Sequence, residues 1–580
     1  MTDHITGFPS IDKPWEKYYT DEQLRTAFVP KSIYQLMRDC NQGYEDDVAI
    51  IYYGNSIRFR HVFKMIDMTA AGLKKAGIVR SDTVIMLLPN VPEAMYIFYA
   101  VNKIGAVIDV IDPRSNIKNI QKEIEDTNCK LVFMLDMQEQ QFRDYNGPAR
   151  IVYISPFYSM PAVKRCVLNI IKPAHIKTSE NRILWKDFLC SDSESDNTVP
   201  FIQDENAVIV HTGGSTGFPK GVLHTNESFN ALVYQLQNHS LNMHRGDTFL
   251  NIIPPFIAIG LDDSLHLAAC LGIKQIFIPS IVPENFPNIV RKYRPNILFG
   301  GPVHFYSFCS ETIFENEDLS YIRICVTGGD TAPDKLQENV DAFLKSHNSS
   351  AKLYNGYGAT EMSSGISCSN PASYCRGTVG IPYLNNNLKI VNPEDFEEEY
   401  SYNRTGELLV SGPTMMVGYV GDYSSETDKA VYTDKSGTRW YVTEDLAHIT
   451  EDGHLFIDGR LKRIITRRGF KIYPMYIEKI ISEHPAVKNC AVVGIPDPVE
   501  YSVPVANIVL KSGATEADRQ DVISYVDRRV RSEISESALM AGYNFLDSLP
   551  MTKIGKLDFK ALEKTGLVDG KRRGQNTYEI

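Results

Sequence analysis

Short apolar, β-branched runs alternate with amphipathic segments along much of the chain. Residues 82–89 form one such run, residues 92–105 have the spacing of a helix, and residues 106–113 form a second run. A strand, a helix and a strand within about 30 residues predict a parallel crossover unit whose sheet is covered on both faces. The same pairing recurs at residues 285–300. We therefore predict an α/β fold built from layers.

Two breaks interrupt this pattern. Residues 156–200 combine prolines, several lysines and the acidic run SDSESD, which is typical of a solvated insertion. A fresh strand and helix pattern begins after residues 459–462. We therefore predict a large N-terminal domain (1–459), a small α+β C-terminal domain (460–565) and a polar tail (566–580).

The composition narrows the classes of function. Of 580 residues, 43% are hydrophobic and 23% are charged, as in ordinary multidomain globular proteins. The 60 basic and 71 acidic side chains leave a net charge of −11, which argues against a nucleic-acid partner. The start lacks the apolar run of a secretory signal, and no stretch approaches the ~20 apolar residues that span a bilayer. Ten scattered cysteines without a CxxC pair predict reduced thiols in a cytoplasmic protein, and they provide no basis for a disulfide or a structural metal.

The most informative segment spans residues 207–229. An apolar strand at residues 207–210 leads into glycines and hydroxyl side chains that end at Lys220. Glycine lets backbone N–H groups approach an anion closely, the hydroxyls add donors and the lysine adds charge, so such a loop can hold a polyphosphate. Neither the Walker A pattern nor GxGxxG fits this loop. Taken alone, the segment leaves a flexible connector open as an alternative.

This segment resembles the signature of the adenylate-forming superfamily, which includes acyl-CoA synthetases, adenylation domains and luciferases. In that family the loop T-[SG]-G-[ST]-T-G-x-P-K-G binds the pyrophosphate end of ATP. The matching residues here are Thr212, Gly213, Gly214, Ser215, Thr216, Gly217, Pro219, Lys220 and Gly221. The resemblance covers roughly residues 13–564. It implies a small β-rich subdomain within the large domain and a mobile C-terminal domain.

Further motifs follow in the family's order. The segment TGGDTAP is similar to the family's glycine turn beside the adenine, and NGYGATEM resembles its YGxTE motif. These two motifs add Gly328, Gly329, Asn355 and Gly356 to the expected ATP site. The resemblance implies that Tyr357 stacks on adenine, that Thr360 hydrogen-bonds the α-phosphate and that Glu361 holds Mg²⁺.

Two more motifs lie near the predicted domain boundary. WYVTEDLA resembles the YxTGD element, in which Asp445 would bind the ribose hydroxyls, and Glu444 replaces the family's usual glycine. GRLKRIITRRGFKIYP resembles the hinge region. By that resemblance Arg460 reaches the nucleotide, Lys462 is the pivot and Gly469 lines the thiol tunnel.

The last motif supplies the expected catalytic lysine. LPMTKIGKLDFKAL matches the family's PxTxxGK pattern, with Lys556 as its lysine. The resemblance implies that a carboxylate attacks ATP to form an acyl-adenylate and pyrophosphate, and that the acyl group then passes to coenzyme A. Lys556 would stabilise the charge that develops in the first step, together with Thr360 and Glu361. Rotation about Lys462 would then remove it.

The substrate acid is less well defined by the sequence. Phe256 is followed by Ile257, where relatives that activate α-amino acids carry an aspartate, and an aliphatic side chain offers no partner to an ammonium group. With Gly260, these residues form the predicted acyl pocket. The start KPWEKYY and the TGG of the phosphate loop resemble medium- and long-chain fatty acyl-CoA synthetases. Tyr476 stands where relatives have a glutamate, which leaves the contacts of the small domain open.

Several alternatives remain open at this stage. The acceptor could be the phosphopantetheine of an acyl carrier protein, since GKLDFKAL also resembles stand-alone adenylation domains. A nucleotide-binding regulator without activity is disfavoured because Glu361, Asp445 and Lys556 are all present. A luciferase-like oxidation uses the same scaffold. The basic residues between Lys164 and Lys177 could make a peripheral membrane contact, although a solvated loop fits them better.

Overall fold

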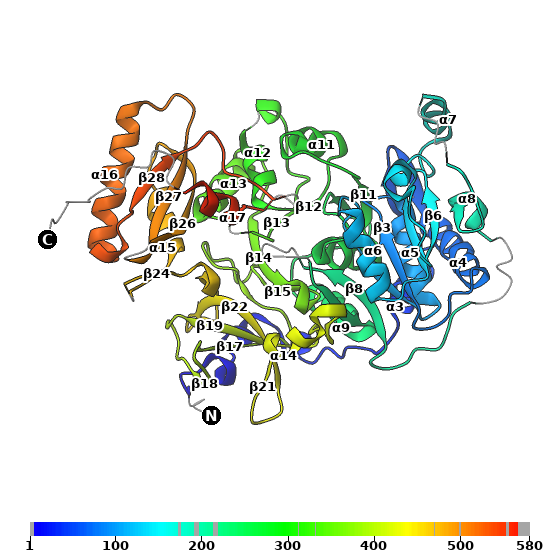
Figure 1. Cartoon of the computed structure of the whole chain (residues 1–580), viewed down its shortest axis with the longest axis horizontal. Helices are drawn as coiled ribbons and strands as arrows, with labels where there is room; N and C mark the ends of the chain where they lie inside the picture. Colours follow the sequence, from blue (N-terminus) through cyan, green and yellow to red (C-terminus); the bar gives the residue numbers. More distant parts are fainter. Residues whose placement is uncertain are drawn as a thin grey trace.

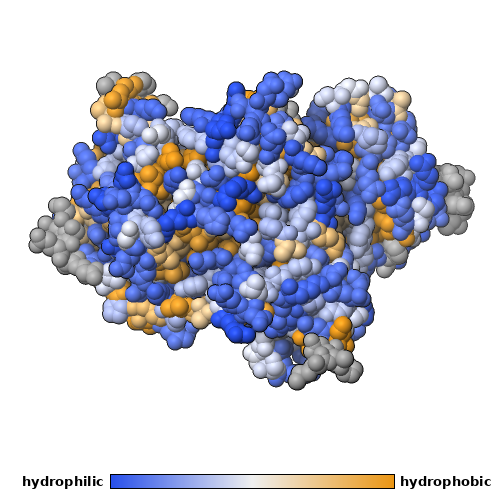
Figure 2. Space-filling view, turned by 180° about the vertical axis from the view of Figure 1, so that it is seen from behind, coloured by the Kyte–Doolittle hydropathy of each residue, from blue (hydrophilic) through white to orange (hydrophobic). Residues whose placement is uncertain are grey.

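The computed structural model describes residues 5–171, 176–190, 197–212, 219–310, 312–330, 332–468, 470–497, 500–552 and 556–566. Over these ranges the chain forms a large mixed α/β domain and a smaller C-terminal domain, which confirms the predicted fold class (Figure 1). Seen from behind, the surface is mainly hydrophilic, with several hydrophobic patches (Figure 2).

One sheet of the large domain has eight strands in the order β20-β9-β8-β4-β3-β5-β6-β7. Its strands are β3 (Thr83–Leu87), β4 (Val107–Val110), β5 (Leu131–Leu135), β6 (Arg150–Ile154), β7 (Arg182–Leu184), β8 (Asn206–His211), β9 (Gly221–Thr225) and β20 (Gly418–Tyr419). Strands β3 to β8 pair in parallel, whereas β9 is antiparallel to β8. The predicted crossover at residues 82–113 is therefore present.

The second sheet of the large domain has nine strands in the order β16-β15-β14-β13-β12-β10-β11-β1-β2. Its strands are β1 (Val48–Tyr52), β2 (Asn55–Arg58), β10 (Thr248–Asn251), β11 (Lys274–Phe277), β12 (Ile297–Gly300), β13 (Ile324–Thr327), β14 (Leu353–Ala359), β15 (Ser364–Cys368) and β16 (Ile381–Pro382). The run from β11 through β14 is parallel, so β13 and β14 end at the same edge of the sheet.

The helices of the large domain cover these sheets. They are α1 (Pro9–Asp12), α2 (Asp21–Leu24), α3 (Ile33–Cys40), α4 (Phe59–Lys75), α5 (Pro92–Lys103), α6 (Ile117–Asp126), α7 (Ala162–Ile171), α8 (Trp185–Phe188), α9 (Asn226–Gln237), α10 (Ala268–Cys270), α11 (Phe286–Tyr293), α12 (Pro302–Ser310), α13 (Asp334–Ser346) and α14 (Thr427–Ala430). Every residue of α5 is buried. Its apolar side chains belong to a hydrophobic cluster that also contains residues of both sheets. The sequence pattern predicted an amphipathic helix there, but packing between two sheets buries it on all sides.

Two smaller sheets follow along the chain. The first comprises β17 (Asn387–Asn392), β18 (Asp395–Glu399), β19 (Gly406–Ser411), β21 (Val431–Thr433), β22 (Arg439–Ile449) and β23 (Leu455–Arg460). The second belongs to the small domain and comprises β24 (Ile465–Arg467), β25 (Phe470–Ile472), β26 (Val487–Asp497), β27 (Tyr501–Leu510) and β28 (Gly542–Phe545), with helices α15 (Pro474–Ser482), α16 (Glu516–Glu533) and α17 (Phe559–Thr565). Isoleucines and valines of this second sheet and its helices form a hydrophobic cluster of their own.

The predicted solvated insertion at residues 156–200 is wrong for part of its length. Strand β7 pairs with β6 and extends the eight-stranded sheet. Trp185 of α8 is only 2% exposed and packs against Phe133 and Phe188. The apolar area of these rings stabilises the segment against the sheet, even though most of its neighbours along the chain are polar.

The described helices include none that combines the length and apolar character needed to cross a lipid bilayer.

Candidate active site

The phosphate loop joins two antiparallel strands. It leaves β8 at His211 and returns at Gly221 of β9. At its base the backbone N–H of Thr212 donates to the carbonyl of Lys220 at 2.9 Å, and the N–H of Lys220 donates to the Thr212 hydroxyl at 3.1 Å. The loop is therefore the closed end of a hairpin and does not open into a helix. The predicted residues Gly213, Gly214, Ser215, Thr216 and Gly217 lie outside the described residues, as does Gly469.

Lys220 lies among acidic and aromatic side chains. Its Nζ is 2.5 Å from Glu426 Oε2 and 4.8 Å from the centre of the Tyr419 ring. The Tyr419 hydroxyl in turn donates to Glu361 Oε1 at 2.7 Å. Tyr419 thus connects the lysine of the phosphate loop with the acid of the YGxTE-like motif.

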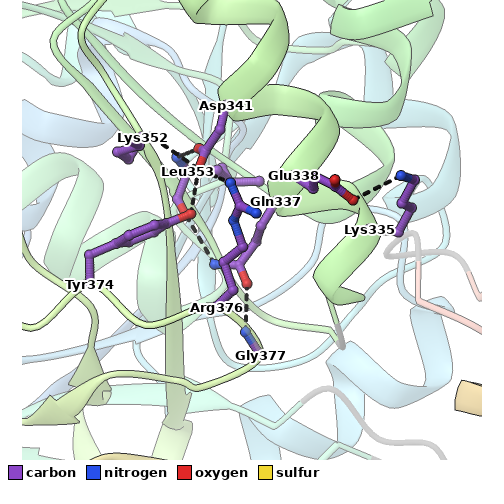
Figure 3. Close-up of polar contacts among 9 residues, drawn as sticks. All are labelled: Lys335, Gln337, Glu338, Asp341, Lys352, Leu353, Tyr374, Arg376 and Gly377. Carbon is purple, nitrogen blue, oxygen red and sulfur yellow. Dashed lines mark hydrogen bonds and ion pairs between the residues drawn. The ribbon is translucent and has the colours of Figure 1, made fainter.

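Strand β14, which carries that motif, is anchored at its first residue by α13 (Figure 3). The backbone N–H of Leu353 donates to Asp341 Oδ1 at 2.9 Å, and its carbonyl accepts a hydrogen bond from Gln337 Nε2 at 3.1 Å. Asp341 Oδ2 accepts from the Tyr374 hydroxyl at 2.6 Å. Its carboxylate is 2% exposed and lies within 3.6 Å of the side-chain nitrogens of Lys352 and Arg376. Opposite charge and hydrogen bonds therefore offset its burial.

In its second half, β14 carries Tyr357, whose hydroxyl contacts Asp445, the aspartate expected to bind the ribose. The Tyr357 hydroxyl donates to Asp445 Oδ2 at 2.6 Å, while Asp445 Oδ1 forms an ion pair with Arg460 Nε at 3.0 Å. Burial raises the pKa of Asp445, and Arg460 and the Tyr357 hydrogen bond oppose that rise. Oδ1 makes no hydrogen bond to any described residue, so it can still accept one from a ligand hydroxyl.

Thr360 and Glu361 form a tight turn after β14, and the side chain of His224 hydrogen-bonds to this turn. Burial lowers the pKa of His224 to about 4, so its ring is neutral. His224 Nε2 therefore donates to the Thr360 carbonyl at 2.8 Å, and Nδ1 accepts from the Ser363 hydroxyl at 3.1 Å. The backbone at Thr360 is thus positioned by a group that remains uncharged at neutral pH.

Glycines just after β13 and within β14 allow a close approach of the two segments. A side-chain carbon on Gly328 would lie 3.2 Å from the Gly356 carbonyl oxygen. Gly329 has φ of 80°, in the left-handed region that side chains disfavour. Asn355 is buried and donates from Nδ2 to the Thr378 carbonyl at 3.3 Å. These predicted ATP-site residues therefore lie next to one another at one edge of the sheet.

Lys556 reaches this edge from the small domain. Surrounding protein desolvates its ammonium group and lowers its pKa, and Arg460 lowers it further, while Asp330, Asp445 and Glu361 oppose the shift. The side chain remains exposed to solvent. Figure 1 shows the segment before α17 extending from the small domain toward the strands of the large one. The tertiary structure therefore places Lys556 within electrostatic range of Asp445 and Glu361, the residues expected to bind the ribose and the metal.

The predicted pivot Lys462 also has an acidic neighbour. Its Nζ lies 2.7 Å from Glu444 Oε2, and both side chains are more than half exposed. Glu444 has φ of 58°, so the backbone keeps the left-handed conformation that the family's usual glycine adopts easily.

The predicted acyl-pocket residues lie at the start of a π-helix, Gly260–Leu267. Phe256 is buried beneath the guanidinium of Arg114, which lies 5.5 Å from the ring centre, and Ile257 is half-buried. A side-chain carbon on Gly260 would overlap the Pro254 carbonyl, so only glycine fits there. Asp262, in this helix, is fully buried, and neither of its carboxyl oxygens bonds to a described residue.

The sequence reasoning missed several members of this site. Tyr419 and Glu426 belong to no recognised motif, and strand β20 and the short helical turn after it are far from Lys220 in sequence, so only the fold could reveal them. Asp330 lies within the TGGDTAP segment, and its negative charge is the feature of the sequence that could have identified it as a member of the site.

The family model for AMP-binding enzymes matches residues 37–420, and the model for the AMP-binding enzyme C-terminal domain matches residues 476–556. The chain therefore belongs to the AMP-binding enzyme family, the adenylate-forming class that its motifs resemble.

Four relatives compared with this chain share 16–27% of their residues with it. A long-chain-fatty-acid–CoA ligase of Bacillus subtilis is 26% identical over 564 residues, which cover 94% of this chain and 96% of that protein. A 4-coumarate–CoA ligase of Humulus lupulus is 27% identical over 509 residues, covering 86% and 87%. Among solved structures, ATP-bound MatB of Rhodopseudomonas palustris is similar with a TM-score of 0.78 at 20% identity, covering 92% of this chain and 99% of that one. A benzoate CoA ligase of Burkholderia xenovorans has a TM-score of 0.77 at 16% identity, covering 92% and 100%.

Proposed function

We propose that this protein is an AMP-forming acid–thiol ligase. It converts an apolar carboxylic acid of the fatty-acid class and ATP into an acyl-adenylate and pyrophosphate. It then transfers the acyl group to the thiol of coenzyme A and releases AMP. The observation that supports the proposal most is that Lys556 of the small domain lies within electrostatic range of Asp445 and Glu361 of the large domain, the residues expected to bind the ribose and the metal.

In the first half-reaction two anions must come together. Lys556 supplies a positive charge beside the attacked α-phosphorus, which lowers the barrier most if the charge is held in place before reaction. Asp445 accepts hydrogen bonds from the ribose, oriented by Tyr357 and Arg460. Lys220 binds the departing pyrophosphate once it leaves its pairing with Glu426.

The donor set at Glu361 fits a magnesium ion. Carboxylate and phosphate oxygens are the ligands that Mg²⁺ prefers, and Glu361 is buried at the edge where the phosphates would lie. When bound, Mg²⁺ would neutralise charge on the phosphates. The hydrogen bond from Tyr419 to Oε1 fixes the orientation of this carboxylate.

In the second half-reaction the thiol needs a route to the acyl-adenylate. If Lys556 enters the site for the first half-reaction, it blocks the entry of the thiol, so the small domain has to rotate between the two steps. We assign the pivot to Lys462 and the tunnel wall to strands β24 and β25, which precede and follow residue 469. Coenzyme A is the proposed acceptor because the curated relatives are CoA ligases.

The preference for an apolar acid rests on the start of the π-helix. Phe256 is buried and Ile257 is half-buried. Both side chains are hydrocarbons, so neither offers a polar partner to an α-ammonium group. The similarity to the Bacillus long-chain-fatty-acid–CoA ligase, which extends over 94% of this chain, supports the fatty-acid class.

The direct test is release of pyrophosphate from ATP with saturated acids of increasing chain length, measured without a thiol acceptor. We expect turnover that rises with apolar chain length and is absent with α-amino acids. A carrier protein bearing phosphopantetheine is then compared with coenzyme A as acceptor. Faster transfer to the carrier protein would make that protein the acceptor in place of coenzyme A. If no acid led to pyrophosphate release, the proposed enzyme function would be rejected.

A further inference from the structure

Three side chains of types that bind metals meet at the end of β8, where the chain enters the phosphate loop, at a place that the proposed reaction does not use. Asp109 lies on β4, His211 ends β8, and Glu123 lies on α6. Strands β4 and β8 are parallel neighbours, which places Asp109 beside Ile209. His211 directly precedes Thr212, the first residue of the phosphate loop.

The three groups are buried and close together. His211 Nε2 is 2.8 Å from Asp109 Oδ1 and 3.9 Å from Glu123 Oε1, and one ligand atom from each residue lies within 4.8 Å of the others. The side chains are 0% (Asp109), 7% (Glu123) and 9% (His211) exposed. This is a compact, nearly dry cluster contributed by three separate elements.

Two carboxyl oxygens in the cluster accept no hydrogen bond from a described residue, although Glu123 Oε1 lies 3.9 Å from His211 Nε2. Asp109 Oδ2 and Glu123 Oε1 are buried and make no hydrogen bond. An unpaired buried carboxyl oxygen is costly, so such oxygens mark a place where a ligand is expected. The nearest lysine on α6, Lys122, is already paired with Asp126 and Asp422.

The imidazole is oriented as a metal ligand. It hydrogen-bonds to the backbone of Pro219, which has no N–H, so the ring must donate to the carbonyl. The other nitrogen, Nε2, then faces both carboxyl groups. Ligating histidines commonly donate their second ring nitrogen to a carbonyl in this way. Without a metal, Nε2 must carry a proton to hydrogen-bond Asp109 Oδ1 at 2.8 Å.

We propose that Asp109, Glu123 and His211 bind one divalent transition-metal ion of the zinc class. Ligand atoms about 2.0–2.2 Å from a tetrahedral ion lie about 3.3 Å from one another, and the observed 2.8 and 3.9 Å bracket that spacing. An imidazole with two carboxylates suits Zn²⁺, Co²⁺ or Fe²⁺ and is a poor set for Mg²⁺, which takes oxygen ligands. The ion would join β4, β8 and α6 at the base of the phosphate loop and replace the Nε2 proton.

Metal binding to the full-length protein tests this proposal. Chelator-treated protein is loaded with Co²⁺ or Zn²⁺ in excess Mg²⁺, dialysed and analysed for metal content, and the visible spectrum of the Co²⁺ form is recorded. We expect one equivalent per chain, with a d–d spectrum of nitrogen and oxygen ligands and no thiolate charge-transfer band. The spectrum separates this site from binding at the ten cysteines.

Two matched substitutions on α6 locate the ion. Glu123→Gln keeps the shape of the side chain and should weaken binding by at least about a hundredfold, more than is typical for loss of a supporting group outside the ligand set. Glu125→Gln is the control, because Glu125 is exposed on the same helix, and its metal content should equal that of the wild type. Asp109→Asn replaces Glu123→Gln if that variant does not fold. Equal retention by the ligand variant and the control, or no retained metal in the wild type, would overturn the proposal.

Discussion

Lys462 and Glu444 form an ion pair across the predicted domain hinge, with 2.7 Å between Nζ and Oε2. Glu444 holds a left-handed backbone conformation, with φ of 58°, where related enzymes have glycine. The glutamate therefore accepts local backbone strain at a position where its carboxylate reaches the pivot lysine. The exposed pair itself contributes little to stability, so its effect is expected on the hinge.

The strain at Glu444 predicts an order of stability for two variants. Glu444→Gly and Glu444→Ala both remove the carboxylate, but only glycine adopts the left-handed conformation without a clash at the side-chain carbon. We expect the glycine variant to be more stable than the alanine variant by about 1 kcal/mol in urea unfolding. An alanine variant of equal or greater stability would show that the backbone at residue 444 is not left-handed.

The hinge assignment predicts a separation of the two half-reactions. Lys462→Pro restricts one backbone dihedral at the proposed pivot and should leave acyl-adenylate formation nearly intact in the arrangement described here. Transfer to coenzyme A should fall at least about tenfold, because the domain rotation becomes harder. Each step is measured separately, by pyrophosphate release and by thioester formation from supplied acyl-adenylate. Retention of both steps would move the hinge elsewhere.

Lys556 should act in the first half-reaction only. Lys556→Ala removes the charge that lies near Asp445 and Glu361, and we expect adenylation to fall by about 10²–10³-fold. Thioester formation from supplied acyl-adenylate should persist. Lys560→Ala, which removes an exposed lysine from α17, is the matched control and should leave both rates unchanged. Equal losses in the two steps of Lys556→Ala would contradict this division.

The anchor of β14 predicts a large effect on stability. Asp341→Ala leaves the buried N–H of Leu353 and the Tyr374 hydroxyl without their acceptor, and we expect a loss of about 3 kcal/mol in the free energy of unfolding. Glu338→Ala, on the same helix, removes only an exposed pair with Lys335 and should cost less than about 0.5 kcal/mol. Similar losses for the two variants would mean that Asp341 does not anchor the strand.

Glu93 predicts a specific dependence of stability on pH. This residue of α5 is fully buried, with Oε1 accepting from the Ser159 hydroxyl at 2.5 Å and Oε2 unpaired among the described residues. Burial raises its pKa to about 7, against 4.5 ordinarily, and the Ser159 hydrogen bond opposes the rise. A carboxyl with a raised folded-state pKa contributes stability below pH 4.5 that is lost as the pH rises through about 7.

Glu93→Gln removes this titration while keeping the hydrogen-bond acceptor. The stability of the variant relative to the wild type should therefore increase by roughly 2–3 kcal/mol between pH 5 and pH 8. Urea unfolding of both proteins at the two pH values measures the difference, in which other titrating groups cancel. Parallel pH profiles would show that Glu93 does not titrate in this range.

The sequence by itself determined the local elements and the order of the motifs. Alternation and helical spacing depend on neighbours along the chain, so residues 92–105 and 106–113 were identified as helix and strand close to their observed bounds, α5 (Pro92–Lys103) and β4 (Val107–Val110). The motif of Tyr357 and the lysine Lys556 could likewise be identified, because their spacing in the chain carries the signal.

Only the tertiary structure decided which distant groups meet. Tyr419 bonds Glu361, Lys556 approaches Asp445, and Asp109 lies against His211, although long stretches of sequence separate each pair. The same packing buries α5 on every side. It also places Trp185, which belongs to a segment predicted to be solvated, in the hydrophobic core. Local patterns report on hydrogen bonds and side-chain direction within one element. Contacts between elements depend on how whole surfaces pack, and no short stretch of sequence contains that information.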